Sequence, residues 1–162
     1  MMATDYFNSV AAGFTTVEAS NDCGDPLPLN AAMGRAVDRL RHMHNRGGDV
    51  YLVGNGGSAA IVAHVQNDFV KAAKIRARLC QDIALLTACS NDLDYAKSMS
   101  SPLSIWLKPS DMLIAVSSSG ESPNIINAIG VAQTHHATVL TFTGFNPANT
   151  IRGTGDLNFY VP

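Results

Sequence analysis

The chain has few charged residues: Asp, Glu, Lys and Arg make up 15% of its 162 residues, and the formal net charge is −2. It therefore lacks the basic excess of proteins that bind nucleic acid or anionic membrane surfaces. It also lacks an apolar run of the roughly 20 residues that span a membrane. Its N-terminus shows neither the basic flank nor the apolar stretch of a signal peptide. We expect a cytoplasmic protein that has neither nucleic acid nor membrane as a partner.

Cysteine is scarce as well. The chain has three cysteines, Cys23, Cys80 and Cys89, an odd number that lacks the spacing of metal ligands. This indicates reduced thiols rather than a disulfide framework. Apolar residues, by contrast, make up 46% of the chain. So many apolar and so few charged residues in a chain of single-domain size favour a surface that is partly buried against another copy.

Short apolar runs alternate with helical patterns along the chain. Runs typical of buried strands occupy residues 49–54, 83–88, 112–117, 138–144 and 157–162, and helical patterns occupy residues 6–19, 29–45, 58–73 and 123–134. This alternation predicts an α/β fold with a doubly wound, five-stranded parallel sheet of flavodoxin-like order 2-1-3-4-5. We expect residues 1–28 to form an N-terminal helical arm that packs on another subunit, and residues 29–162 to form the domain itself.

Two turns rich in small residues follow the first and third predicted strands. VGNGGSAA, residues 53–60, brings glycines to the start of a helix, where unpaired N–H groups suit an anion. SSSGESPN, residues 117–124, supplies serine hydroxyls, with Ser122 placed to cap a helix and Pro123 suited to its first turn. Strands one and three are neighbours in this order, so both turns are expected to open into one crevice. The pair predicts a ligand with one phosphate group.

The glycine turn is open to other interpretations. Gly54, Gly56 and Ala59 fit the dinucleotide pattern G-x-G-x-x-G/A, but no acidic residue follows directly on the second predicted strand to bind a ribose. A P-loop requires Gly-Lys-Ser/Thr, and this turn has no lysine. Either turn alone is also compatible with a simple connection. The two together favour a phosphate monoester.

The two motifs resemble those of the sugar isomerase (SIS) domain. They are Gly-Asn-Gly-Gly-Ser at residues 54–58, with His64 downstream, and Ser-Ser-Ser-Gly-Glu-Ser-Pro at residues 117–123. Within the family they resemble the phosphoheptose isomerase branch, which acts on sedoheptulose 7-phosphate. The resemblance covers about residues 30–162 and implies a homotetramer with active sites at subunit interfaces. The same branch includes a non-catalytic relative that binds the bacterial replication initiator, so a sugar-phosphate sensor or an adaptor is the alternative to an isomerase.

The resemblance also implies roles for individual positions. Asn91 and Tyr95 match a stretch that contributes to the family's sugar site. Glu121 stands where the isomerase branch commonly has asparagine. By the resemblance, the phosphate is held by Ser58, Ser117, Ser119 and Ser122, with Ser118 in the same cradle, and the sugar is contacted by Asn55 and Asp92. Gly56 and Gly57 complete the predicted substrate-binding residues.

The family's catalytic carboxylate corresponds to Asp68, where the family usually has glutamate. Asp68 lies four residues after His64, so the two share a helix face. By the resemblance they are the expected catalytic residues. Some family members bind zinc through this pair and two later ligands, although the sequence itself requires no cofactor. Aspartate is one methylene shorter, and a shift of about 1 Å in a catalytic group can cost on the order of 100-fold. The family's final helix, with a glutamine and a catalytic histidine, would follow the fifth strand, where this chain ends at Pro162.

Overall fold

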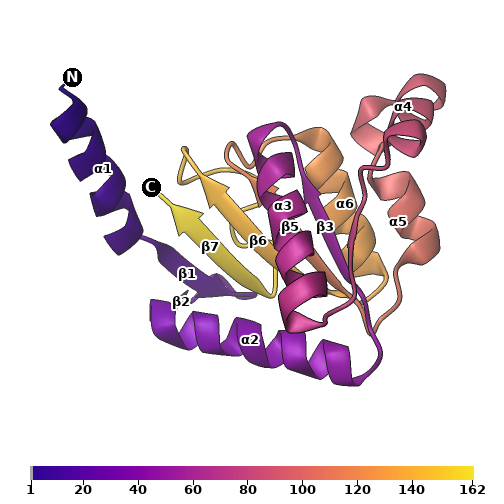
Figure 1. Cartoon of the computed structure of the whole chain (residues 1–162), viewed down its shortest axis with the longest axis horizontal. Coiled ribbons are helices and arrows are strands. Elements are labelled where there is room, and N and C mark those ends of the chain that lie inside the picture. The colour runs from indigo at the N-terminus through magenta and orange to yellow at the C-terminus, as the bar shows by residue number, and fades with distance from the viewer. Residues whose placement is uncertain (1) are drawn as a thin grey trace.

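The computed structural model describes residues 2–162 and has three layers, with helices on both faces of one sheet (Figure 1). No helix within these residues is long and apolar enough to cross a membrane. A π-helical turn, Phe69–Ala73, extends α3, and a 3-10 turn, Tyr95–Lys97, precedes α5. The helices are α1 (Ala3–Thr15), α2 (Leu29–Asn45), α3 (Gly57–Asp68), α4 (Ile83–Asp92), α5 (Ser100–Trp106) and α6 (Pro123–Thr134). The strands are β1 (Glu18–Asn21), β2 (Pro26–Leu27), β3 (Val50–Gly54), β4 (Ala77–Leu79), β5 (Met112–Ser117), β6 (Thr138–Gly144) and β7 (Leu157–Val161).

The strands lie side by side in the order β2-β1-β7-β6-β5-β3-β4. The five from β3 to β7 pair in parallel and, counted along the chain, lie in the order 2-1-3-4-5. The doubly wound α/β fold predicted from the sequence is confirmed. The predicted count of five strands was too low, because β1 and β2 add an antiparallel extension at the β7 edge.

Each face of the sheet buries one apolar cluster, because alternate strand residues point to opposite faces. Val53 and Leu113 face α5 and α6, whereas Leu52 and Ile114 face α2 and α3. Burying an aliphatic side chain of this kind contributes about 1.5–3 kcal/mol relative to leaving it exposed. The helices of both layers are visible around the sheet in Figure 1.

The prediction of the second strand, at residues 83–88, was wrong. Residues 83–88 form the first part of α4, which begins where the Asp82 carboxylate accepts a hydrogen bond from the Leu85 amide at 3.0 Å. The second parallel strand is instead β4, a short segment at the sheet edge. An apolar run of this length fits a buried strand or a helix, so periodicity alone did not separate them. None of the residues of α4 is buried.

The helix α1 projects from the rest of the molecule (Figure 1). It lies at residues 3–15 rather than at the predicted residues 6–19, since the chain turns into β1 at Glu18. None of its residues is buried, and the side chains of Phe7 and Phe14 are exposed to 66% and 73%. A helix with exposed aromatic residues presents a surface that a partner can cover.

Candidate active site

The glycine turn connects β3 to α3. A Cβ at Gly54 would lie 2.8 Å from the backbone carbonyl of Ser58, so only glycine lets the strand end this close to the first turn of α3. The Asn55 carbonyl accepts a hydrogen bond from the Ser58 amide at 2.9 Å. The amides of Gly56 and Gly57 form no hydrogen bond with another residue of the described chain. The turn therefore presents free N–H groups at a helix N-terminus, where an anion is favoured.

The serine turn connects β5 to α6. Ser117 is 5% exposed, and its Oγ accepts a hydrogen bond from the Gly120 amide at 3.2 Å. The Oγ of Ser119 accepts one from the Glu121 amide at 3.3 Å. Because these oxygens act as acceptors, their O–H groups stay available to a ligand. Ser122 occupies the N-cap position of α6 but forms no side-chain cap bond, so the expected capping contact is absent and this hydroxyl is also available.

The loop between β6 and β7 supports the serine turn. Gly120 has φ +65° and lies against the Asn149 side chain, which leaves no room for a Cβ. The Glu121 carboxylate accepts hydrogen bonds from the Thr150 amide at 2.7 Å and from the Thr150 hydroxyl at 2.6 Å. These bonds hold the pKa of Glu121 below its usual range, so the carboxylate is ionised at neutral pH. Glu121 therefore fastens the turn to the loop instead of extending toward a ligand.

A reciprocal amide pair joins the two turns. β3 and β5 are neighbouring parallel strands, with Gly54 opposite Val116. The Nδ2 of Asn55 donates to the Oδ1 of Asn124, and the Nδ2 of Asn124 donates to the Oδ1 of Asn55, each at 2.9 Å. Asn124 is 1% exposed and was not among the predicted site residues. The two turns thus share one edge of the sheet, as the strand order predicts.

Tyr95 also contacts this pair. Its hydroxyl donates to the Oδ1 of Asn55 at 2.9 Å, so that this oxygen accepts two hydrogen bonds and Asn55 keeps one N–H for a ligand. Asp92 lies at the end of α4, is exposed, and accepts a hydrogen bond from the Asn91 side chain at 2.8 Å. The structure therefore brings Tyr95, and not Asp92, into hydrogen-bond contact with Asn55.

His64 and Asp68 lie on the exposed face of α3. The Nε2 of His64 is 3.5 Å from the Oδ2 of Asp68, and the side chains are 76% and 61% exposed. Their predicted proximity on one helix face is confirmed. A structural zinc site usually has four ligands in a tetrahedral arrangement, and this pair supplies two of them. No third His, Cys, Asp or Glu joins them within residues 2–162, so the pair alone does not fit a zinc site.

A cavity of about 290 Å³ lies beside the serine turn, at the ends of β6 and β7. Ser118 and Thr143 contribute its polar lining. Thr143 is 5% exposed, and its hydroxyl has no hydrogen-bond partner in the described part of the chain. A buried hydroxyl without a partner costs about 1–3 kcal/mol. Thr143 was not among the predicted site residues, because a threonine within a strand gives no local signal.

The fold of this α/β domain places the two turns side by side at the point where its strand order reverses. Residues 5–144 match the family model of the SIS domain, and the chain belongs to this family.

Known relatives narrow the assignment within the family. The phosphoheptose isomerase of Burkholderia pseudomallei (strain 1710b) is 37% identical over 140 residues, which cover 83% of this chain and 71% of that protein. The phosphoheptose isomerase of Roseiflexus sp. (strain RS-1) is 33% identical, covering 96% and 85%. The solved phosphoheptose isomerase of Neisseria gonorrhoeae has a TM-score of 0.72 at 25% identity, covering 82% of this chain and 74% of that one. The one from Francisella tularensis shares the fold, with a TM-score of 0.85 at 22% identity and coverages of 100% and 86%. The chain therefore falls in the phosphoheptose isomerase branch of the SIS family.

Proposed function

We propose that this chain is a phosphosugar isomerase that interconverts sedoheptulose 7-phosphate and the corresponding heptose 7-phosphate. The observation that carries the proposal is the junction of the two turns through Asn55 and Asn124, which places two candidate anion-binding elements side by side. The similarity to phosphoheptose isomerases favours an enzyme over a non-catalytic binding module.

In this proposal the phosphate group binds between the two turns. The free amides of Gly56 and Gly57 and the hydroxyls of Ser119 and Ser122 donate hydrogen bonds to its oxygens. Both α3 and α6 direct their N-termini, and hence a partial positive charge, at this position. The remaining predicted phosphate ligands, Ser58, Ser117 and Ser118, belong to the same two turns.

The chemical step moves one proton between adjacent carbons through an enediol and a second proton between the oxygens of these carbons, so it requires a base and an acid. Asp68 is the proposed base: it removes the proton from C1 of the ketose and returns it to C2 of the enediol, which gives the aldose. His64 holds the carboxylate from 3.5 Å, and the free N–H of Asn55 orients a sugar hydroxyl. At about 1.5 Å per residue, Asp68 lies roughly 15 Å along α3 from Ser58, which suits a long sugar phosphate better than a short one.

We also propose that a homo-oligomer, expected to be a tetramer, completes the site. An exposed carboxylate such as Asp68 is surrounded by water, whereas isomerisation benefits from a site that excludes it. The exposed aromatic residues of α1, among them Phe7 and Phe14, supply an apolar surface for another copy to cover.

Asp92, which does not contact Asn55 within a single chain, stays a predicted sugar contact. The cytoplasmic location also stays a prediction.

Thermal unfolding with and without sedoheptulose 7-phosphate, combined with a colorimetric assay of its conversion, tests the proposal. A ligand at 100 times its Kd adds about 2.7 kcal/mol to the free energy of unfolding. Unphosphorylated sedoheptulose is the matched control and should give no shift. A shift with turnover supports the proposal. A shift without turnover would identify a sensor, and no shift would contradict phosphosugar binding.

A further inference from the structure

A second cavity, of about 620 Å³, follows the outer edge of β4. None of the predicted site residues lines it. Its apolar wall includes Tyr51 and Trp106, whose rings lie nearly parallel, at 17° with centroids 6.3 Å apart. Trp106 keeps 37% of its surface exposed, so a flat face is available to a ligand. The volume lies in the range of about 300–1,000 Å³ that small-molecule sites occupy.

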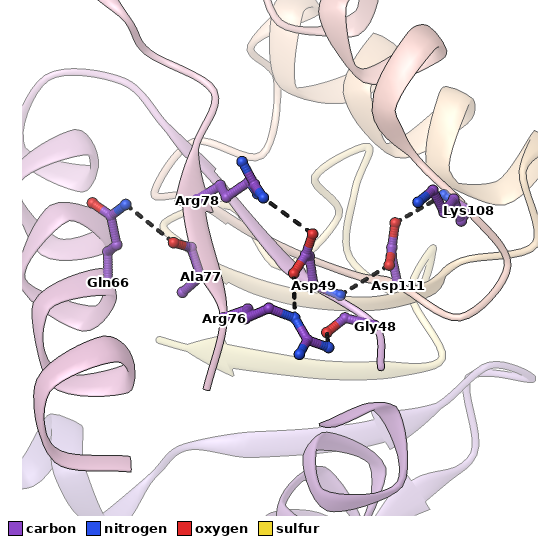
Figure 2. Close-up of polar contacts among 8 residues, drawn as sticks. All are labelled: Gly48, Asp49, Gln66, Arg76, Ala77, Arg78, Lys108 and Asp111. Carbon is purple, nitrogen blue, oxygen red and sulfur yellow. Dashed lines mark hydrogen bonds and ion pairs between the residues drawn. The ribbon is translucent and has the colours of Figure 1, made fainter. Parts of the chain in front are cut away.

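Two cations of this cavity are available to an anion. The Asp49 carboxylate is neutralised mainly by Arg76, whose Nε lies 2.8 Å away, while Arg78 makes a longer contact at 3.4 Å (Figure 2). The Lys108 side chain forms no ion pair within residues 2–162. The other acidic lining residue, Asp82, already accepts a hydrogen bond as the N-cap of α4. Within residues 2–162, Lys108 therefore carries an unpaired positive charge, and Arg78 shares the Asp49 carboxylate with Arg76.

Beneath these side chains lies the buried carboxylate of Asp111. It accepts hydrogen bonds from the backbone amides of Asp49 and Lys108, each at 2.9 Å, as Figure 2 shows. These two hydrogen bonds fix the position of both residues at the cavity. The polar side of the cavity is held in place before any ligand arrives.

Tyr51 adds a directional donor. It is only 4% exposed, its side chain lines the cavity, and its hydroxyl forms no hydrogen bond with another described residue. Burial, together with the nearby carboxylates of Asp111 and Asp49, raises the pKa of Tyr51 to about 12. The phenol therefore keeps its proton at neutral pH and has no acceptor of its own.

We propose that the cavity at the β4 edge is a binding site for a small anion with a flat ring, of the nucleoside monophosphate class. The ring stacks on Trp106, Arg78 and Lys108 bind the phosphate, and Tyr51 donates its proton to a ligand acceptor. Stacking on an aromatic face tolerates different bases, and guanidinium groups suit phosphate oxygens. The polar groups converge on one cavity from β3, β4 and the segment before β5.

Gln81 connects this cavity to the crevice. It lines the cavity, and its Nε2 donates to the carbonyl of Gly54, the residue at which the glycine turn begins. A ligand that engages the Gln81 amide changes the support of that turn. We therefore expect an occupant of the cavity to alter the affinity of the crevice for its sugar phosphate, an expectation that rests on the proposed function.

Trp106 is the single tryptophan of the chain, so its fluorescence reports on this cavity directly. Titration with adenosine 5′-monophosphate is expected to give a saturable change in Trp106 fluorescence. Adenosine alone or inorganic phosphate alone should give a weaker change. Arg78→Gln and Lys108→Gln should each raise the Kd about tenfold, as the loss of a charge-assisted hydrogen bond does. Arg35→Gln, an exposed arginine of α2, should leave the Kd unchanged. A change that does not saturate, or an unchanged Kd in Arg78→Gln, overturns the proposal.

Tyr51→Phe removes only the hydroxyl and keeps the stacked ring. It should raise the Kd several-fold with the same fluorescence end point, and an unaltered Kd would reduce the site to unspecific stacking and overturn the proposal. The Kd of sedoheptulose 7-phosphate is then measured with and without saturating adenosine 5′-monophosphate. Equal values overturn the link through Gln81. Failure of the sugar phosphate to bind at all contradicts the proposed function instead, because the tryptophan titration stays readable.

Discussion

The two halves of the candidate active site are held in different ways. The binding half, the two turns, is joined by buried, hydrogen-bonded residues, with Asn124 and Ser117 at 1% and 5% exposure, while the proposed phosphate donors Gly56, Gly57 and Ser119 are exposed. The chemical half, His64 and Asp68 on α3, is exposed, with side chains 76% and 61% exposed. A single chain thus fixes the two turns relative to each other but leaves the proposed base in water. On the proposed function, binding depends on the fold of one chain, whereas the chemistry depends on a second copy that covers α3.

The largest expected effect is the loss of turnover on substitution of Asp68, the proposed base in the chemical half of the site. Asp68→Asn should lower kcat by about 10²–10⁴-fold, the contribution typical of a general base. The Kd of sedoheptulose 7-phosphate and the unfolding temperature should stay nearly unchanged, because Asp68 is exposed and outside the crevice. Steady-state kinetics give kcat, and thermal unfolding with and without the ligand gives the Kd and the unfolding temperature. Asp38→Asn, an exposed aspartate of α2, is the matched control. A kcat within tenfold of the parent would remove Asp68 from the chemistry.

The second effect tests the junction of the binding half. Asn124→Ala leaves the Nδ2 of Asn55 without its acceptor, while the Oδ1 of Asn55 keeps only the bond from Tyr95, and an unpaired polar group away from water costs about 1–3 kcal/mol. Urea unfolding should show a loss of that size, accompanied by weaker binding of the sugar phosphate. Asn30→Ala on the exposed side of α2 should change neither. If Asn124→Ala unfolds like the parent, the amide pair does not hold the turns together.

A smaller effect is expected at a single phosphate donor. Ser119→Ala should weaken sedoheptulose 7-phosphate binding about tenfold, since a hydrogen bond to a charged group contributes about 1.5–3 kcal/mol. The free energy of unfolding should stay within about 0.5 kcal/mol of the parent, as for other exposed positions. Isothermal titration and urea unfolding check both values, with Ser104→Ala on α5 as the control. A lower kcat at unchanged affinity would move Ser119 into the chemical half.

The smallest expected effect is a pH dependence of the stability that Glu121 gives to the serine turn. The pKa of Glu121 is lowered in the folded protein by its hydrogen bonds from Thr150, so its carboxylate stabilises the fold above the ordinary pKa of about 4.3. That stabilisation is lost as the pH falls through the lower, folded pKa. The difference in Tm between the parent and Glu121→Gln should therefore shrink as the pH falls below about 5. A constant difference would show that Glu121 does not support the serine turn through its charge.

The sequence predicted those parts of the fold that local chemistry decides. The run 138–144 coincides with β6, and the helical patterns at 29–45 and 123–134 coincide with α2 and α6, because turn residues mark their ends. The run 83–88 was assigned to the wrong structure, since its apolar residues suit either a strand or a helix and only Asp82, as a cap, favours the helix. β1 and β2 were missed because such short strands depend on long-range pairing, β1 with β7 and β2 with β1.

The same division applies to the candidate site. The two turns were predictable because glycines and serines act through their own backbone and hydroxyls. Asn124 was not predicted, because its partner Asn55 lies 69 positions away in the sequence. A signal was available: Asn124 shares the stripe of α6 that includes Ala128 and Ala132, both buried, where a polar residue requires a partner. The contact of Tyr95 with Asn55 spans 40 positions and depends in the same way on packing.

The amide pair also bears on how this protein ages. Asn55 precedes Gly56, and an asparagine before a glycine is readily attacked by the next backbone nitrogen, with loss of ammonia. Water then opens the cyclic imide to aspartate or isoaspartate, whose carboxylate would repel a phosphate bound between the turns. In the folded chain the Asn55 side chain is held by Asn124 and Tyr95, so the attack requires these hydrogen bonds to open. The bonds that join the two turns should therefore also slow this reaction.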